Sequence, residues 1–217
     1  MVSVVRGGAR GAAALNRAFS VLRLKAIVSR LFVAVTLPDP VRAKLADLQR
    51  EIKQVLPPES ASWTQPGNMH LTLRFLGKVA SSRIPELSEK LSRALAGFGD
   101  LDLVCEGSGC FPDLHAPRVI WAGVHGAEER LLQLHRRVDE AVAGFAQQPA
   151  EAAFVGHITL ARFKSIPRST AEQTARFVEA AAARRFGGWR VPTVSLIHSQ
   201  RSPAGTSYAE RLSANLT

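Results

Sequence analysis

The sequence predicts an α+β fold of two similar lobes, each a mostly antiparallel sheet with helices on its outer side. Two observations lead to this prediction. First, His70-Leu71-Thr72-Leu73 recurs 87 residues later as His157-Ile158-Thr159-Leu160, which indicates a duplicated unit. Second, predicted strands alternate with predicted helices, but several strands are joined by turns too short for parallel pairing. We expect a β-α-β-α-β-type unit in each half and a cleft between the lobes.

The first half of the chain begins with an apolar, β-branched run over 31–37, which predicts a strand. Pro38-Asp39-Pro40 interrupts it, and Asp39 as N-cap before Pro40 predicts a helix that ends at Pro57-Pro58. The first histidine strand follows and ends at Gly77. Apolar periodicities then predict the remaining elements of this half, a helix over 84–98 and strands over 101–105 and 118–124.

The second half repeats this order. Leucines and valines at spacings of three and four predict a helix from about residue 127. The second histidine strand comes next. Ser169-Thr170-Ala171-Glu172 has the form of a capping box, so we expect a helix from there to Gly187-Gly188. Strands over 191–198 and 208–212, joined by a turn at Pro203-Ala204-Gly205, close the chain.

Composition limits the class of protein. Apolar residues make up 46% and charged residues 21%, as in ordinary globular proteins, and no apolar run approaches the roughly 20 residues that span a bilayer. We therefore expect no membrane partner. Cys105 and Cys110 have no second pair nearby to complete a zinc site, so we expect reduced, structural thiols and a cytoplasmic protein. We also expect a monomer.

The net charge of +10 is unevenly distributed. Residues 1–30 contain six basic residues and no acid, so the rest of the chain is only +4. This body charge suits a phosphate ligand in a focused cleft better than a broad duplex-binding face. We divide the chain into a basic leader, 1–29, and one bilobal domain, 30–217. The leader has three interpretations: a disordered arm, an organellar targeting segment, or an upstream start assigned ahead of the true one.

The histidine motifs carry the chemistry. In a strand, alternate side chains share a face, so His and Thr of each motif point one way and the aliphatic residues the other. One imidazole held neutral acts as a base while a protonated partner acts as an acid. Each threonine hydroxyl adds a donor for a phosphoryl oxygen. Together these groups are suited to in-line attack at phosphorus.

Other functional sites have less support. Two histidines could ligate zinc, but no further ligand follows either motif. No G-x-S-x-G nucleophile elbow, phosphate-binding P-loop or dinucleotide fingerprint occurs. Trp63 is either a base-stacking platform or, more in keeping with an aromatic beside a turn, a packing residue. The other histidines are interpreted as structural or exposed, with His198 the next to check after the two motif histidines; they are His115, His125, His135 and His198.

The paired H-x-T-x motifs resemble the two-histidine (2H) phosphoesterase superfamily. More narrowly, the chain resembles the bacterial and archaeal RNA 2′,3′-cyclic phosphodiesterases, also called 2′-5′ RNA ligases. The resemblance extends over roughly 30–215 and rests on several motifs in order. These are Arg30-Leu31-Phe32-Val33-Ala34, Asn68 to Gly77 around the first histidine, Phe111-Pro112 with Pro117 to Trp121, and His157 to Arg162.

The resemblance implies the bilobal fold, no cofactor and no metal requirement. It implies hydrolysis of RNA ends or small nucleotides bearing a 2′,3′-cyclic phosphate to 2′-phosphomonoesters. His157 would be the proton acceptor that activates water, and His70 the proton donor to the departing 3′ oxygen. Thr72 and Thr159 would bind the phosphate. The same two histidines working in reverse would give 2′-5′ RNA ligase activity.

Arg162 matches a family position that helps hold phosphate or base. It lies five residues after His157, so strict alternation would place it on the opposite face. The assignment therefore requires the strand to end or to bulge before Arg162. Arg118 and Phe75 are weaker candidates for the same site, since Arg118 is equally well explained as a solvated charge.

Two other functions stay open. One is a 2H enzyme with another substrate, such as ADP-ribose 1″,2″-cyclic phosphate or a 2′-5′ oligoadenylate, because the motifs handle phosphorus while the loops select the nucleoside. The other is a non-catalytic nucleotide- or RNA-binding module. The intact His and Thr of both motifs argue against the second.

Overall fold

A computed structural model describes residues 27–126, 129–149, 153–203 and 205–217. Within these residues it contains four α-helices, two of them in each half of the chain. They are α2 (Asp39–Val55), α3 (Ile84–Leu95), α4 (Arg130–Val142) and α5 (Arg168–Ala180). The strands are β1 (Val28–Thr36), β2 (Ser62–Trp63), β3 (His70–Ala80), β4 (Leu101–Phe111), β5 (Val119–Gly126), β6 (His157–Arg162), β7 (Arg185–Val191), β8 (Thr193–Ser202) and β9 (Gly205–Asn215).

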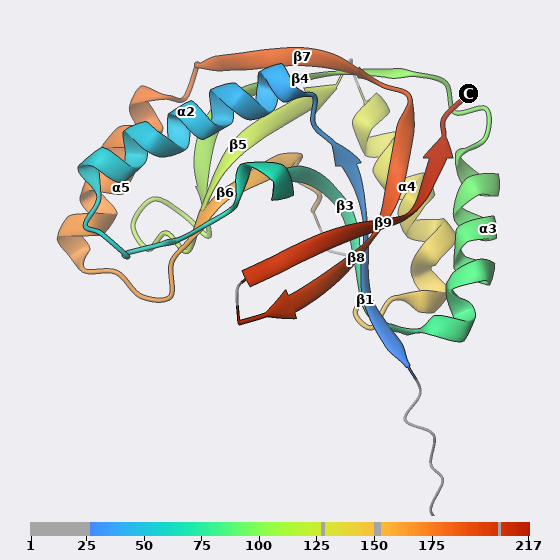
Figure 1. Ribbon diagram of the computed structural model, residues 1–217. Coiled ribbons are helices and arrows are strands. Elements are labelled where there is room, and N and C mark those ends of the chain that lie inside the picture. Colours follow the sequence, from blue (N-terminus) through green and yellow to red (C-terminus); the bar gives the residue numbers. More distant parts are fainter. Residues whose placement is uncertain (1–26, 127–128, 150–152, 204) are drawn as a thin grey trace, which may run out of the picture.

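The strands form one curled antiparallel sheet in the order β7-β4-β5-β6-β3-β1-β8-β9, with β2 paired to β6 (Figure 1). The two histidine strands, β3 and β6, lie next to each other at its centre. The order is nearly symmetric about them, since β5 flanks β6 as β1 flanks β3. This confirms the predicted α+β fold of two similar lobes.

The lobes exchange strands. β4 follows α3 in the first half of the chain but pairs with β5, which the sequence analysis grouped with the first half and which begins the second set of elements, β5-α4-β6-α5. In return, β8 of the second half pairs with β1 of the first, from Leu31↔His198 to Ala34↔Ser195. Each lobe is therefore completed by the other half of the chain.

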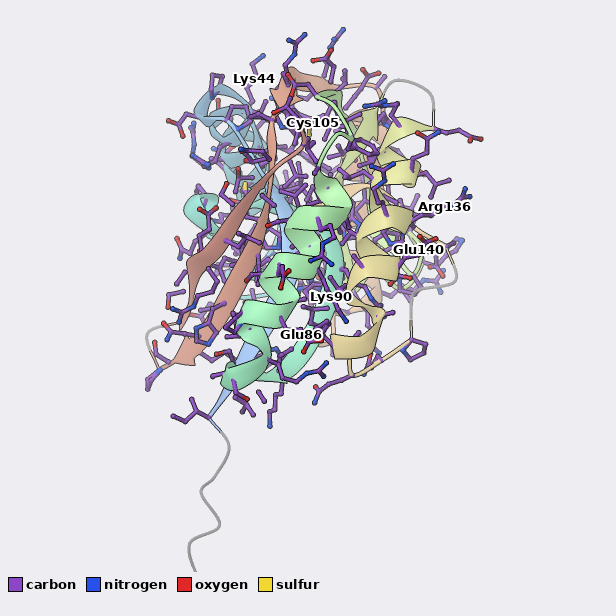
Figure 2. All side chains as sticks on the ribbon, turned by 90° about the vertical axis from the view of Figure 1, so that its right-hand side faces the viewer. Lys44, Glu86, Lys90, Cys105, Arg136 and Glu140 are labelled. Atoms are coloured by element: carbon purple, nitrogen blue, oxygen red, sulfur yellow. The ribbon has the colours of Figure 1, made fainter. Side chains whose placement is uncertain are left out.

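The helices cover the outer face of the sheet. α2 and α5 lie over one lobe, while α3 and α4 pack side by side over the other (Figures 1 and 2). Leu45, Leu91 and Val138 are fully buried on the inner faces of α2, α3 and α4. Charged residues labelled in Figure 2, such as Lys90 of α3 and Arg136 of α4, lie on the outer surface of these helices. The concave face of the sheet is left open for a site.

The last predicted helix is wrong at both ends. α5 has Pro167 as its N-cap, and Glu172 of the expected capping box pairs with Arg168 (Nε to Oε1, 3.0 Å) instead of capping. The helix ends at Ala180, before Gly187-Gly188, and β7 follows, which the sequence analysis missed. β7 pairs with β4 and buries Phe186, so tertiary pairing overrides the helical propensity of the preceding alanines.

The start of α2 and the end of β3 also differ slightly from the sequence-based prediction. Pro38, not Asp39, is the N-cap residue of α2. β3 continues through Gly77 to Ala80, and Gly77 has a φ of +76°, a conformation that favours glycine.

The ordered sheet begins at Val28, two residues before the predicted domain boundary. The leader assignment otherwise falls on residues 1–26, which lie outside the described residues. Among the described helices, none has both the length and the apolar content that crossing a bilayer requires.

Candidate active site

A bulge occurs at the same place in both histidine strands. The register of β1 with β3 jumps from Val33↔Arg74 to Ala34↔Thr72, which leaves Leu73 without an opposite residue. The register of β5 with β6 jumps from Ile120↔Ala161 to Trp121↔Thr159, which leaves Leu160 without one. Each extra leucine stands three residues after its histidine and is buried.

The bulge reverses the alternation of side chains beyond it. In β6, Leu160 and Ala161 are both buried, and Arg162 returns to the face that carries His157 and Thr159. The sequence analysis required the strand to end or to bulge before Arg162, and the structure shows a bulge at Leu160. In β3 the equivalent position is Phe75, which is likewise turned into the cleft and is 54% exposed.

His70 lies among aromatic rings. Phe32 of β1 stacks on its imidazole with ring centroids 4.7 Å apart, and Tyr208 of β9 makes an edge contact at 5.3 Å. Its Nδ1 is 2.7 Å from the carbonyl oxygen of Asn68, which fixes the orientation of the ring. Burial lowers the pKa of His70 to about 4; the Asn68 carbonyl opposes this shift, while the charges of Arg162 and His157 add to it.

His157 has the same backbone anchor in different surroundings. Its Nδ1 is 2.8 Å from the carbonyl oxygen of Val155, again two residues earlier in the chain. Phe111 contacts the ring edge-on at 5.0 Å, and Trp121 lies 6.4 Å away. When the imidazole is neutral, an Nδ1–H that donates to a carbonyl leaves the lone pair on Nε2, the tautomer that a base requires.

Both histidines line one cleft of about 930 Å³ on the concave face of the sheet. Thr72, Thr159 and Arg162 line it too, so the structure brings together all five residues that the sequence assigned to the site. The guanidinium of Arg162 donates to the hydroxyl of Thr159 (Nη2 to Oγ1, 3.3 Å).

The cleft is electropositive. Arg30 and Arg201 line it in addition to Arg162, and its described lining contains no carboxylate. Such a cleft concentrates anions such as phosphodiesters. The sequence analysis did not assign Arg30 or Arg201 to the site, because each lies on a strand remote in sequence from both histidine motifs.

One wall of the cleft is held by Arg74, the residue after the bulge in β3. Its guanidinium is buried, pairs with Asp139 of α4 (Nε to Oδ1, 2.8 Å) and donates to the carbonyl oxygens of Gln148 and Pro149. Gln148 and its neighbour Gln147 line the cleft. Arg74 therefore ties this wall to the first histidine strand from behind.

Of the residues that the sequence analysis held as weaker site candidates, some line the cleft and others do not. Phe75 lies in the cleft, whereas Arg118 is exposed, donates to the carbonyl oxygen of Lys164 and does not line the cleft. His198 does not line it either; its Nδ1 is 2.9 Å from Arg211 Nη2. Trp63 packs partly against the core and also borders the cleft.

Neither the two cysteines nor a cluster of metal ligands belongs to this site as the structure describes it. Cys105 and Cys110 are free and buried, and burial raises the pKa of each thiol to about 12. Within the described part of the chain, no three His, Cys, Asp or Glu side chains come together as metal ligands.

The aromatic neighbours of the histidines were missed by the sequence analysis as site residues. Phe32, Tyr208 and Trp121 each reach the site through strand pairing, and an aromatic residue in a strand is ordinarily a packing residue. The two carbonyl anchors carry no signal in the sequence at all, since every residue has a carbonyl.

Two imidazoles anchored through Nδ1 on duplicated strands, with threonine hydroxyls beside them in one cleft, are the features expected of a two-histidine phosphoesterase. The family model described as LigT-like phosphoesterase matches residues 35–121 and 124–208. The chain belongs to this family.

Relatives and solved structures agree with the family. An RNA 2′,3′-cyclic phosphodiesterase of Archaeoglobus fulgidus is 32% identical over 183 residues, covering 83% of this chain and 97% of its own. One of Methanothermobacter thermautotrophicus is 29% identical over 181 residues, covering 83% and 95%. The crystal structure of TT0787 from Thermus thermophilus has a TM-score of 0.69 at 30% identity, covering 86% and 97%. Escherichia coli LigT complexed with 3′-AMP has a TM-score of 0.68 at 25% identity, covering 88% and 99%.

Proposed function

We propose that this protein hydrolyses the 2′,3′-cyclic phosphodiester at RNA ends to a 2′-phosphomonoester, by acid-base catalysis that needs no metal. The observation that carries the proposal is the pair of oriented imidazoles in one cleft with Thr72, Thr159 and Arg162. The relatives named RNA 2′,3′-cyclic phosphodiesterase support the choice of substrate.

In the proposed reaction, Nε2 of His157 removes a proton from water, and the water oxygen attacks phosphorus. The bond between phosphorus and the 3′ oxygen breaks as Nε2 of His70 gives its proton to that oxygen. The product is a 2′-phosphomonoester with a free 3′ hydroxyl, and one water is consumed. His157 ends protonated and His70 neutral, so exchange with solvent restores both.

Arg162 and the two threonines would stabilise the charge that builds on the phosphoryl oxygens during the attack. Arg162 is already held beside Thr159 by its hydrogen bond, so little reorganisation is needed when the phosphate enters. The described residues that line the cleft include no carboxylate, which strengthens the effect of these three residues on an anion.

The lowered pKa of His70 means that this histidine must gain a proton before it can act as the acid. With a pKa of about 4, His70 is neutral at pH 7 in the unliganded protein. The anionic phosphodiester must therefore raise the pKa of His70, because a negative charge beside the imidazole favours its protonated form, whereas burial disfavours it. Once protonated, an imidazole in such a buried position is a strong proton donor to a departing alkoxide.

The deciding experiment is product analysis on an oligonucleotide with a 2′,3′-cyclic phosphate end. We expect only the 2′-phosphate, distinguished from the 3′-phosphate by 31P NMR, and undiminished activity in EDTA. A 3′-phosphate product would contradict the roles of the two histidines. Loss of activity with EDTA and recovery with zinc or manganese would contradict metal independence.

Substrate selectivity is tested by a panel. We expect 2′,3′-cyclic RNA ends to be turned over faster than ADP-ribose 1″,2″-cyclic phosphate or 2′-5′ oligoadenylate. The reverse order of rates would support the proposed acid-base chemistry but contradict the proposed substrate.

We further propose that the protein works as a monomer in the cytoplasm. Two free, buried thiols suit a reducing compartment. A single species of 23.4 kDa in size-exclusion chromatography with light scattering is the expected result for the full chain.

A further inference from the structure

A second, smaller cavity adjoins the cleft where β2 ends at Trp63. It has a volume of about 190 Å³, and we call it the α2 pocket. Its lining comes from α2 and from the segment that leads to the first histidine strand: Ala46, Gln49, Arg50, Lys53, Trp63, Thr64, Gln65 and Pro66. Trp63, Thr64 and Gln65 line the cleft as well. Residues 62–65, which we call the rim, thus separate the two cavities.

The rim is firmly tied to the second histidine strand. Ser62 lies opposite Arg162 in the pairing of β2 with β6, so the rim begins beside a proposed phosphate ligand. Gln49 of α2 is only 3% exposed, and its Nε2 donates to the carbonyl oxygens of Thr64 and Leu160, both at 2.8 Å. A buried amide that joins helix, rim and strand keeps the α2 pocket at a fixed position relative to the catalytic cleft.

The α2 pocket is basic. Lys53 and Arg50 line it, and no carboxylate does. Arg50 pairs with Asp47 of the same helix, whereas Lys53 makes no ion pair among the described residues. The ammonium of Lys53 lies 5.0 Å from the centre of the Trp63 ring, a cation-π arrangement that holds it at the rim. Since Lys53 occupies one face of the indole, this site is better suited to a phosphate than to a stacked base.

We propose that the α2 pocket binds the backbone phosphate of the nucleotide that precedes the cyclic end. The RNA strand would leave the cleft beside Arg162, cross the rim and place that phosphate on Lys53, with Arg50 next to it. Cationic grooves combined with aromatic side chains are the usual means of holding single-stranded nucleic acid. This inference rests on the proposed function and adds that the protein binds the RNA strand beyond its terminal cyclic nucleotide.

The test compares substrates of different length in matched variants. Lys53→Gln removes the charge at the α2 pocket. Lys44→Gln removes a charge from the same helix at an exposed position that lines neither cavity (Lys44 is labelled in Figure 2). Each variant is assayed on adenosine 2′,3′-cyclic phosphate and on an eight-nucleotide RNA with a 2′,3′-cyclic end.

We expect Lys53→Gln to lower kcat/KM for the eight-nucleotide RNA about fivefold. The slope of log KM against log salt concentration should decrease by roughly 0.7, the value for one lost phosphate contact on a single strand. Turnover of the cyclic mononucleotide should stay within twofold of wild type, and Lys44→Gln should behave as wild type on both substrates.

Two results would overturn the inference: equal effects of Lys53→Gln and Lys44→Gln on the RNA, or an equal loss on the mononucleotide. Failure of the wild-type protein to hydrolyse either substrate would instead contradict the proposed function itself.

Discussion

The two histidine strands have the same backbone and different side-chain surroundings. Both carry H-x-T-x, both bulge at the leucine three residues after the histidine, and both anchor Nδ1 on a carbonyl two residues before it. After the bulge they diverge. β3 places Arg74 behind the sheet and Phe75 in the cleft, whereas β6 places Ala161 behind it and Arg162 in the cleft.

This difference shows how a duplicated frame becomes an asymmetric site. The repeated backbone brings the two imidazoles to one cleft. The neighbouring strands surround His70 with Phe32 and Tyr208, and His157 with Phe111 and Trp121. Of the divergent positions themselves, the one in β3 adds an aromatic ring to the cleft and the one in β6 adds a cation. An acid and a base need unlike environments, so the divergence matters as much as the repeat.

The largest effect is expected from removing either imidazole. His70→Ala and His157→Ala should each lower turnover of a 2′,3′-cyclic nucleotide by at least about 100-fold, the low end for general acid-base groups. Because the two groups act in one step, the double variant should lose much less than the product of the single losses. Steady-state kinetics measure this; turnover by either single variant within twofold of wild type would refute the mechanism.

The next effect concerns the residue behind the bulge. Arg74→Ala copies the alanine of the second motif, and we expect it to lower the free energy of unfolding by about 3 kcal/mol, because it leaves Asp139 unpaired and two carbonyls without donors. Urea denaturation measures the change. Arg93→Ala removes an exposed ion pair of α3 and serves as the control, with an expected change below about 0.5 kcal/mol. Equal changes would show that the buried pair is not important for stability.

A smaller effect separates the two threonines. Thr72→Val and Thr159→Val should each reduce kcat/KM about tenfold, since each removes one donor to a charged oxygen. Only Thr159 bonds to Arg162, so Thr159→Val and Arg162→Gln should be non-additive, whereas Thr72→Val and Arg162→Gln should add. Double-mutant cycles on kcat/KM provide the measurement. Equal coupling in both cycles would mean that Arg162 serves the two threonines alike.

The smallest effect is on the pKa of His70. Arg162→Gln removes a positive charge that disfavours the imidazolium, so the pKa of His70 should rise above about 4. It should remain below 6.5, because burial is the larger cause of the shift. Inorganic phosphate should raise the pKa of His70 in the wild-type protein. NMR titration of the imidazole resonances checks both, and a fall in either case would contradict the assigned causes.

The sequence was sufficient for the centre of the site and insufficient for its surroundings. The two motifs predicted which residues share a face, and the need for the strand to end or to bulge before Arg162 followed from alternation alone. The position of Tyr208 beside His70 depends on β9 pairing with β8 and β8 with β1. No local pattern encodes such long-range pairings. β7 was missed for the same reason, since its pairing with β4 outweighs the local preference for helix.

The exchange of strands between the lobes bears on how the protein is made. While the ribosome is still adding the second half, β1 has its β3 neighbour, but its other edge waits for β8, more than 160 residues later in the chain. Contacts between residues so distant in sequence slow folding and leave a strand edge exposed in the meantime. The nascent protein should therefore depend on chaperones until its last strands emerge, and neither half should be recoverable as a stable fragment.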